Sequence, residues 1–335
     1  MQNATRLVYN QLLTRLGELN GVPSAREQFA IDPSVQQTLE TKIQESSEFL
    51  GKVNIIGVTE MKGDKLGLGV SGPIASRTNT DAKDREPRSV ETLDELGYEC
   101  KKTNYDTFIK YATLDAWAKF PDFQTRVRDV IVKRQAIDRM VIGFNGTHAA
   151  ANTDLVANPL LQDVNIGWLE HVRLDAAARV LDSGAAADKV MVGEAGDYKN
   201  LDALVYDAYQ TLLDPWFRND GALVAIVGRN LLHDKLFPLV SEPSAPTEIL
   251  AADIVRSQRR LGGLPALTVP YFPENKVLIT RLDNLSIYWQ MSARRRSLVD
   301  NAKRDRIENY ESSNDAYVVE DYGLAALIEN IEIAD

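Results

Sequence analysis

Residues 54–76 read NIIGVTEMKGDKLGLGVSGPIAS, and the interpretation of the whole chain depends on them. Gly67, Gly69 and Gly72 have the G-x-G-x-x-G spacing of a dinucleotide-binding loop. That loop binds a pyrophosphate only where a strand ends and a helix begins, because the free N–H groups of the helix hold the phosphates. Residues 73–81 show no apolar repeat of 3.6 residues. We therefore interpret the segment as a glycine-rich strand that continues into a loop, and a nucleotide-binding enzyme is the weaker hypothesis.

The residues around this segment predict a long two-stranded arm. Its charged tip, Arg77–Arg88, is nearly free of apolar side chains. Strands are predicted on both sides of the tip, at Lys65–Val70 and at Tyr98–Tyr111, where aromatic and β-branched residues gather. A two-stranded ribbon is only marginally stable alone in water. We therefore expect the arm to lie against a neighbouring copy of the same protein.

Composition excludes several classes of protein. The chain has 335 residues, a net charge of −10 and one cysteine, so no intrachain disulfide can form, and a reducing cytoplasm is expected. No apolar run approaches the ~18 residues of a membrane span, and the amphipathic N-terminus lacks the apolar core of a signal peptide. The acidic balance argues against a protein whose main task is nucleic-acid binding. Arg294–Arg296 is a possible local basic patch, but a solvated or salt-bridged turn is favoured.

The N-terminal region predicts a removable segment. Leu7, Leu12, Leu16 and their neighbours recur at helical spacing, so a helix is expected over Thr5–Leu19, ending before Gly21. Asp32-Pro33 then has the pattern of a helix start. The first 31 residues are therefore expected to form a separate unit on a short polar linker, which a protease removes easily.

The remainder predicts two kinds of structure. Pro121–Asn145 is the longest helix candidate, with Gly146 as its end, an apolar stripe that includes Val130, and Arg139 off that stripe. After Gly193 the pattern alternates between helices and strands, which is typical of a mixed domain. Helices are expected at residues 201–212, 231–239, 249–261 and around 323–328, and strands at residues 223–227, 266–269, 276–280, 285–289, 317–319 and 331–333. Residues 262–265, with Gly262-Gly263, are expected to form a turn.

A search for catalytic groups predicts no catalytic, cofactor-binding or metal-binding residues. The three histidines, His148, His171 and His233, have no partners at metal-ligand spacing, and neither a G-x-S-x-G elbow nor a P-loop is present. His233-Asp234 is interpreted as a pair on a helix surface. Cys100 is interpreted as a small apolar residue in a strand, and Glu320-Asp321 as solvated charges near a subunit contact. A chain of this size without a catalytic constellation suggests a structural protein that assembles.

Many short motifs resemble, in the same order and nearly end to end, the major capsid protein of peduovirus-type tailed phages. No single motif is diagnostic, but their collinearity is highly specific. The motifs that carry the resemblance are Gln44–Ser47, Glu60–Gly63, Tyr98–Cys100, Thr113–Asp115, Asp122–Gln124, Gly143–Gly146, Asn158–Val164, Gly167–Leu169, Val269–Pro273, Glu308–Ser312 and Tyr317–Tyr322.

The resemblance implies an α+β chain with the Hong Kong 97-type capsid fold. The parts that it implies are an N-terminal helical segment removed in maturation (residues 1–31), an N-terminal arm (32–53), an extended β-hairpin loop (54–105), a peripheral domain with a long spine helix (106–199 and 294–335) and an axial domain (200–293).

It also implies a function and partners. The protein would self-assemble into hexamers and pentamers of an icosahedral head that encloses double-stranded DNA without sequence-specific binding. Its other partners would be an internal scaffold that is also a protease and a portal protein, and it would act in the virion after assembly in the bacterial cytoplasm, with no membrane contact. A cellular shell compartment of the same fold is the alternative.

Two sets of site residues follow from the resemblance. Cleavage is expected within residues 27–32, near Phe29-Ala30. The arm of one subunit would bury Leu66, Leu68 and Val70 against its neighbour. Covalent cross-linking of the loops through Lys and Asn, which occurs elsewhere in this fold, is not carried over to any residue here.

Overall fold

The computed structural model describes residues 1–65, 75–87, 97–120, 122–232 and 260–334. It contains two compact units, each built from three separate stretches of chain, which are described here one at a time. The first unit comprises residues 1–63, 99–167 and 286–317, and the second comprises residues 64–98, 168–285 and 318–335.

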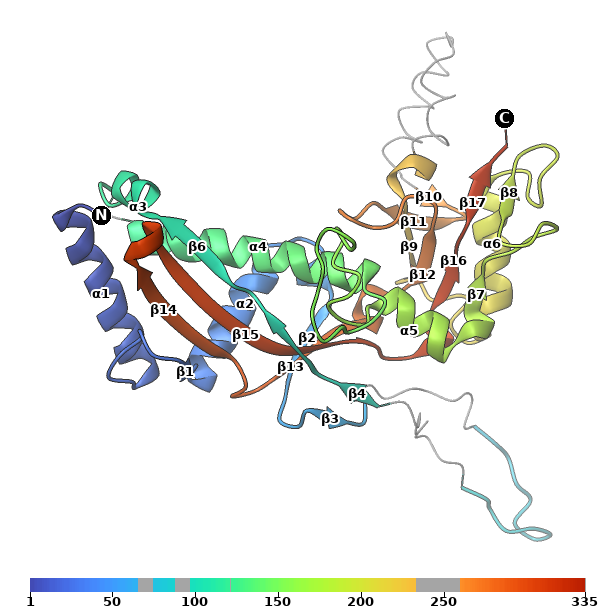
Figure 1. The fold of residues 1–335 in the computed structure, drawn as a ribbon. Helices are drawn as coiled ribbons and strands as arrows, with labels where there is room; N and C mark the ends of the chain where they lie inside the picture. The colour runs from blue at the N-terminus through green and yellow to red at the C-terminus, as the bar shows by residue number, and fades with distance from the viewer. Residues whose placement is uncertain (66–74, 88–96, 121, 233–259, 335) are drawn as a thin grey trace, which may run out of the picture. The chain divides into compact units, whose positions relative to one another are not determined.

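The first unit is a curved sheet with helices packed on it (Figure 1). Its helices are α1 (Asn3–Asn20), α2 (Pro33–Glu45), α3 (Tyr111–Trp117) and α4 (Phe123–Asn145), with short 3-10 turns η1 (Leu50–Lys52) and η4 (Ala302–Arg304). Its sheet strands are β1 (Phe29–Ala30), β2 (Asn54–Val58), β5 (Lys101–Asn104), β6 (Thr107–Lys110), β13 (Leu285–Gln290), β14 (Arg295–Asn301) and β15 (Arg306–Val319).

The long strand β15 organises this sheet. The described strand order is β1-β14-β15-β13-β2, and β5 and β6 also pair with β15. Within the β14–β15 pair, Leu298 lies opposite Asn309, and Ile307 on β15 lies opposite Ile109 on β6. Leu298 and Ile307 are both buried in one core with α1, α3 and α4. A separate short sheet pairs β3 (Lys62–Gly63) with β4 (Tyr98–Glu99).

The predicted helix boundaries are largely confirmed. Asp32 caps α2, because its carboxylate accepts a hydrogen bond from Ser34 N at 2.9 Å, and Pro33 opens the helix. Gly21 ends α1 in the left-handed region, with φ of 63°. Gly146 ends α4, but its backbone is extended, and a Cβ there would lie 2.2 Å from Asn165 O. Close packing, rather than a left-handed turn, therefore requires this glycine.

The N-terminal segment differs from its prediction. The helix exists, but the first 31 residues are not a separate unit, because they belong to the first unit and form part of its core. The region after Gly21, expected to be an unpatterned linker, contains β1, which adds an edge to the sheet beside β14. The sequence pattern of α1 shows only that it is amphipathic, and the surface that buries its apolar side comes from residues about 100 and 300 positions away.

The second unit is a mixed sheet covered by α6. Its elements are α5 (Trp168–Asp175), η2 (Ala177–Arg179), β7 (Val180–Leu181), β8 (Val190–Val192), α6 (Leu201–Leu212), β9 (Val224–Val227), β10 (Arg260–Leu261), β11 (Leu264–Leu267), β12 (Val277–Thr280), η3 (Leu282–Asn284), η5 (Tyr322–Leu324), β16 (Ala326–Ile328) and β17 (Ile331–Ile333). The main described order is β10-β11-β9-β12-β16-β7, and β17 pairs with β8. Its core includes Leu204, Val205 and Ala208 of α6 and Val227 and Ile279 of the sheet.

Most predicted elements of this unit are confirmed, with one exception. Residues 323–328, expected to be helical, instead form η5 and then the fully buried strand β16, antiparallel to β12. A short run of apolar residues fits a buried strand and a buried helix equally well, so periodicity could not decide. The turn at Gly262-Gly263 is confirmed and joins β10 to β11, with φ of 59° and 85°. The helices predicted over residues 231–239 and 249–261 fall mostly outside the described residues.

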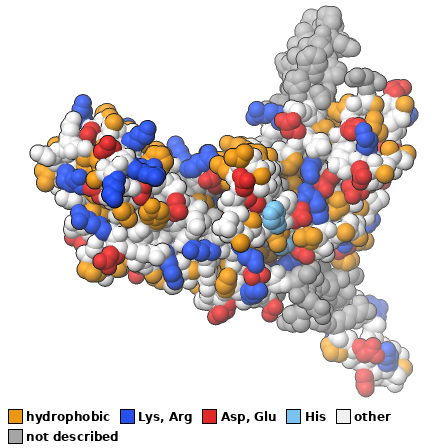
Figure 2. All heavy atoms as spheres, viewed as in Figure 1, with side chains coloured by type: hydrophobic (Ala, Val, Ile, Leu, Met, Phe, Trp, Pro, Cys, Tyr) orange, Lys and Arg blue, Asp and Glu red, His pale blue; other side chains and the backbone are white. Residues whose placement is uncertain are grey.

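In the described part of the chain, no helix has the length and apolarity that crossing a bilayer requires. On the face drawn in Figure 2, Lys and Arg side chains are interspersed with acidic and hydrophobic ones.

Candidate processing and assembly sites

The N-terminal segment contributes to the core of the first unit. Tyr9 and Leu13 of α1 are buried against Leu114, Ile131 and Leu298. Because the hydroxyl and ring of Tyr9 are removed from water, burial raises its pKa to about 12. Fully burying a large apolar side chain stabilises a fold by roughly 1.5–3 kcal/mol. The segment is therefore an integral part of the described fold.

Polar contacts fasten the same segment. Arg6 forms an ion pair with Asp300, and the hydroxyl of Tyr111 donates a hydrogen bond to the same carboxylate. The backbone N–H of Gln2 donates to Asp115 Oδ1 at 2.9 Å. Burial opposes ionisation of Asp300, but the hydrogen bonds from Tyr111 and Arg6 outweigh it, so the pKa of Asp300 is lowered. An ionised Asp300, on β14, therefore helps to hold α1 in place through Arg6.

The predicted cleavage bond lies inside a paired strand. Phe29 is opposite Arg296 and Ala30 is opposite Arg295, in antiparallel register. On one side of this pairing the N–H of Leu298 donates to Ala25 O, and on the other the N–H of Ile31 donates to Arg294 O, both at 2.9 Å. Phe29 is only 7% exposed. A protease needs an extended, accessible chain, so this bond is protected while β1 remains paired.

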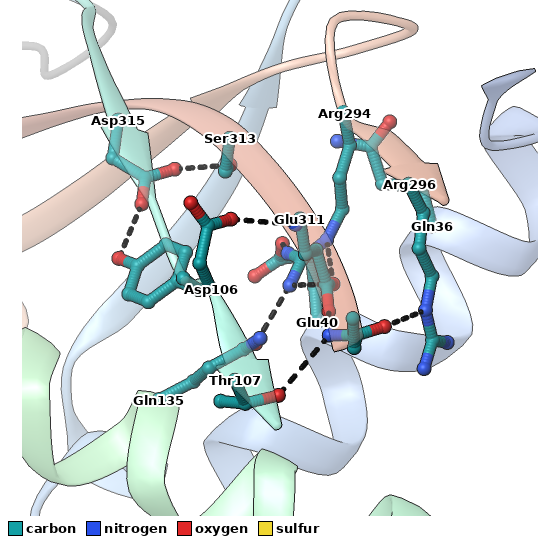
Figure 3. A network of polar contacts seen from close by, with 12 residues as sticks. Gln36, Glu40, Asp106, Thr107, Gln135, Arg294, Arg296, Glu311, Ser313 and Asp315 are labelled. Carbon is teal, nitrogen blue, oxygen red and sulfur yellow. Dashed lines mark hydrogen bonds and ion pairs between the residues drawn. The ribbon is translucent and has the colours of Figure 1, made fainter. Parts of the chain in front are cut away.

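A buried ionic network ties together α2, α4, β14 and β15, and Figure 3 shows most of it. The guanidinium of Arg294 is fully buried and donates to Glu40 Oε1 at 2.6 Å, to Gln135 Oε1 at 2.6 Å and to Glu311 Oε1 at 2.8 Å. Arg139, also fully buried, pairs with the other oxygen of Glu40. Two cations from distant parts of the sequence therefore share one carboxylate.

Further acids complete this network. Arg139 Nη2 lies 3.3 Å from both carboxylate oxygens of Asp315, and the hydroxyls of Ser313 and Tyr105 donate to Asp315 at 2.6 and 3.1 Å. Burial opposes the charge of Glu311, yet Arg294 and Arg296 outweigh that effect and lower its pKa. Losing one partner from such a site typically costs about 3–5 kcal/mol, because the other charge stays buried and uncompensated.

The network corrects two predictions. Within Arg294–Arg296, Arg294 is salt-bridged as expected but fully buried, whereas Arg295 is exposed and Arg296 is half-buried; Arg295 and Arg296 belong to β14, so the segment is not a turn. Arg139 does not lie off the apolar stripe of α4, whereas Val130, assigned to the stripe, is exposed. One signal could have revealed Arg139: at helical spacing it lies between Ala136 and Ile142, both buried.

The residues considered for catalysis have other roles. Cys100 is buried and its pKa is raised to about 12, by burial first and then by Asp315 and Glu99, so it is a thiol and not a nucleophilic thiolate. The residues that the structure describes contain no group of three or more His, Cys, Asp or Glu side chains able to hold a metal ion. Asp321 caps η5 by accepting from Gly323 N at 2.7 Å. His233-Asp234 lies outside the described residues.

The sequence analysis did not predict one polar pair that the structure contains. His171 Nδ1 lies 3.0 Å from Asp175 Oδ2, one turn apart on α5, and the hydroxyl of Tyr322 donates to the same carboxylate oxygen at 2.5 Å. The spacing of four residues on a helix is the signal that could have found it. The hydrogen bond from His171, opposed by burial and helped by Tyr322, lowers the pKa of Asp175.

The expected inter-subunit contacts of the arm, Leu66, Leu68 and Val70, lie outside the described residues. The structure does describe where the chain enters and leaves this region. The N–H of Cys100 donates to Met61 O at 2.8 Å, and Lys62 Nζ lies 3.0 Å from Glu99 Oε1. The two ends of the segment between residues 63 and 98 are therefore side by side.

Comparison with known proteins gives matches over almost the whole chain. The family model described as phage major capsid protein, P2 family, matches residues 8–331. The chain is 47% identical over 344 residues to the capsid protein of Escherichia phage P2, covering 100% of this chain and 96% of the relative. It is 40% identical over 342 residues to the major capsid protein of Serratia phage KSP20, covering 100% and 98%.

Solved structures agree with these matches. A chain of the satellite phage P4 procapsid that includes the size determination (Sid) protein has a TM-score of 0.84 and 45% identity, over 100% of this chain and 99% of that one. The capsid of an empty GTA particle has a TM-score of 0.50 and 15% identity, over 86% and 90%, a likeness of fold alone. The α+β fold described above therefore matches those of capsid proteins of the Hong Kong 97 type.

Proposed function

The chain belongs to the P2 family of phage major capsid proteins, and we propose from this how its parts serve the icosahedral head that such subunits form. It is a structural component of the virion capsid and not an enzyme. The observation that carries this is the continuous match to capsid proteins from residue 8 to residue 331, accompanied by a fold match over the full chain. Neither the cellular-compartment alternative nor the nucleotide-binding one gains support from these matches.

Each segment of the chain is proposed to serve as one structural part of the capsid subunit. Residues 106–199 and 294–335 serve as the peripheral domain with α4 as its spine, and residues 200–293 serve as the axial domain whose tips meet at the axes of hexamers and pentamers. Residues 32–53 form the N-terminal arm. Residues 54–105 form the extended loop, which lies over a neighbouring subunit through Leu66, Leu68 and Val70. The adjacent entry and exit of this loop at Met61 and Cys100 support a hairpin course.

Processing is the second part of the proposal. An internal scaffold protein that is also a protease cuts between Phe29 and Ala30, and the portal protein and packaged double-stranded DNA are the other partners. The uncut segment is seated in the first unit, and the fold match to the P4 procapsid chain includes it, since that match covers 100% of this chain. The described conformation is therefore proposed to be that of the precursor.

The test is electron microscopy of the chain produced together with its scaffold protein. Closed icosahedral particles are expected, and intact mass of chains from DNA-filled heads should correspond to loss of the first 29 residues. Only irregular aggregates or dispersed subunits would contradict the assembly proposal. Full-length chains in filled heads would contradict the cleavage proposal alone.

A further inference from the structure

The loop that follows α4 has a tip whose apolar side chains are exposed to solvent. Leu155, Val156 and Leu160 are 64%, 93% and 39% exposed. The eight residues 155–162, LVANPLLQ, contain no charged side chain, in a chain of which 26% is charged. An exposed leucine by itself is ordinary, but several apolar side chains on one uncharged tip form a patch of the type found at contact sites.

The tip is held in place by its own hydrogen bonds. One carboxylate oxygen of Asp154 accepts from Val156 N at 2.9 Å and from Ala157 N at 3.2 Å. The N–H of Asp154 in turn donates to the buried carboxylate of Asp163 at 2.7 Å. Both acids near the tip are therefore engaged within the loop, and the outward position of Val156 is built into the fold.

The base of the loop is braced as well. The N–H of Thr147 donates to Gln162 O at 2.7 Å, and the N–H of Ala150 donates to Asp163 O at 2.9 Å. The N–H of Gly167 reaches Gly146 O at 3.1 Å, so the two ends of the loop meet where α4 stops. A preorganised loop loses little conformational entropy when it docks, which leaves more of the apolar contact energy for binding.

We propose that this tip, residues 155–160, is a hydrophobic anchor that contacts a second copy of the chain in the assembled shell. The inference rests on the capsid function given above. Permanent contacts between identical subunits are more apolar than transient ones. DNA is a poor occupant, because gripping phosphates needs Lys or Arg and the tip has none. A single small contact is weak, but a closed symmetric shell repeats it on every subunit.

The direct test measures burial of position 156 in the shell. A Val156→Cys variant places a thiol at the tip, and the only other thiol, that of Cys100, is buried and contributes little background. Maleimide labelling of free subunits is compared with that of closed shells, with and without scaffold. At least about tenfold slower labelling in shells of both kinds is expected. Equal labelling in shells and free subunits, or protection only while scaffold is present, would overturn the proposal.

The second test changes assembly rather than labelling. Val156→Asp should leave the subunit folded, with an unchanged Tm, and lower the yield of closed shells about tenfold, because the new carboxylate would be buried at the contact. The matched control is Ala151→Asp, which adds the same charge to an exposed position of the same loop. Normal shell yield for Val156→Asp, or a large fall in its Tm, would contradict the anchor. Failure of the unaltered chain to form shells would instead refute the capsid function.

Discussion

Arg294 reaches Glu40 with its Nη1 atom 2.6 Å from Oε1, and neither side chain is more than 3% exposed. The two residues are 254 positions apart and join the chain immediately before β14 to α2 inside the first unit. Because Arg139 of α4 binds the other oxygen of the same carboxylate, Glu40 is the point where three elements are held together. Several tests follow from this and from the seating of the N-terminal segment.

Replacing Glu40 should strongly destabilise the subunit. Glu40→Gln leaves two buried guanidiniums without their shared carboxylate, so the free energy of unfolding should fall by about 3–5 kcal/mol. Denaturant unfolding monitored by circular dichroism measures the change. Glu45→Gln, on the same helix but in an exposed pair with Lys42, should change stability by less than about 0.5 kcal/mol. Equal effects of the two substitutions would show that burial of the network does not matter.

Acidification should remove the contribution of Glu311. Its pKa is lowered in the folded chain, so its stabilisation is fully present above the ordinary glutamate pKa of about 4.3 and is lost as the pH falls through the folded value. The Glu311→Gln variant should be less stable than the unaltered chain at pH 7, and the difference should begin to shrink as the pH falls below about 4.3, because the protonated glutamic acid resembles glutamine. A difference in the free energy of unfolding that stays constant from pH 7 to pH 3 would contradict this assignment.

The bond after Phe29 should be cut slowly in the folded precursor, and faster when the segment is loosened. Asp300→Asn weakens the contacts with Arg6 and Tyr111, so opening should be easier by roughly 0.5–1 kcal/mol, or about two- to fivefold in rate. Limited chymotrypsin digestion, with the product beginning at Ala30 followed by mass spectrometry, measures it. Asp283→Asn, which alters an exposed pair with Arg281, is the control. Rapid cutting of the unaltered chain at Phe29 would mean that β1 does not protect the bond.

Deletion of Arg77–Arg88 should impair the shell and not the subunit. These residues form the charged tip of the proposed extended loop, and Arg77–Pro87 are described as exposed or half-buried, so the fold does not need them. Soluble subunits with an unchanged Tm and few stable closed shells are expected, as measured by sedimentation and electron microscopy. Normal shells from the deletion variant would show that the tip is not needed between subunits.

Local signals in the sequence were sufficient for most elements of the fold. Asp32-Pro33 predicted the start of α2 because capping depends on adjacent residues only. The same holds for the turn at Gly262-Gly263. The collinear motifs pointed to the capsid fold and function, which a single element could not have done.

Features that depend on distant partners could not be predicted in this way. The apolar residues of α1 showed that it would pack against something, but not that the surface would be formed by Leu114, Ile131 and Leu298. The burial of Arg139 depends on Glu40 and Asp315, which come from other parts of the chain. The strand at β16 was ambiguous because a three-residue apolar run has no readable period.

The packing of residues 1–31 into the core has a consequence for the order in which the subunit folds and is cut. If the chain folds with Tyr9, Leu13 and Phe29 in its core and is cut afterwards, the shortened polypeptide holds a structure that it did not have to reach unaided. Its shape would then be inherited from the longer chain and maintained by its neighbours in the shell. Denatured subunits from mature heads would not be expected to refold as readily as the precursor, so the cut would make assembly a one-way process.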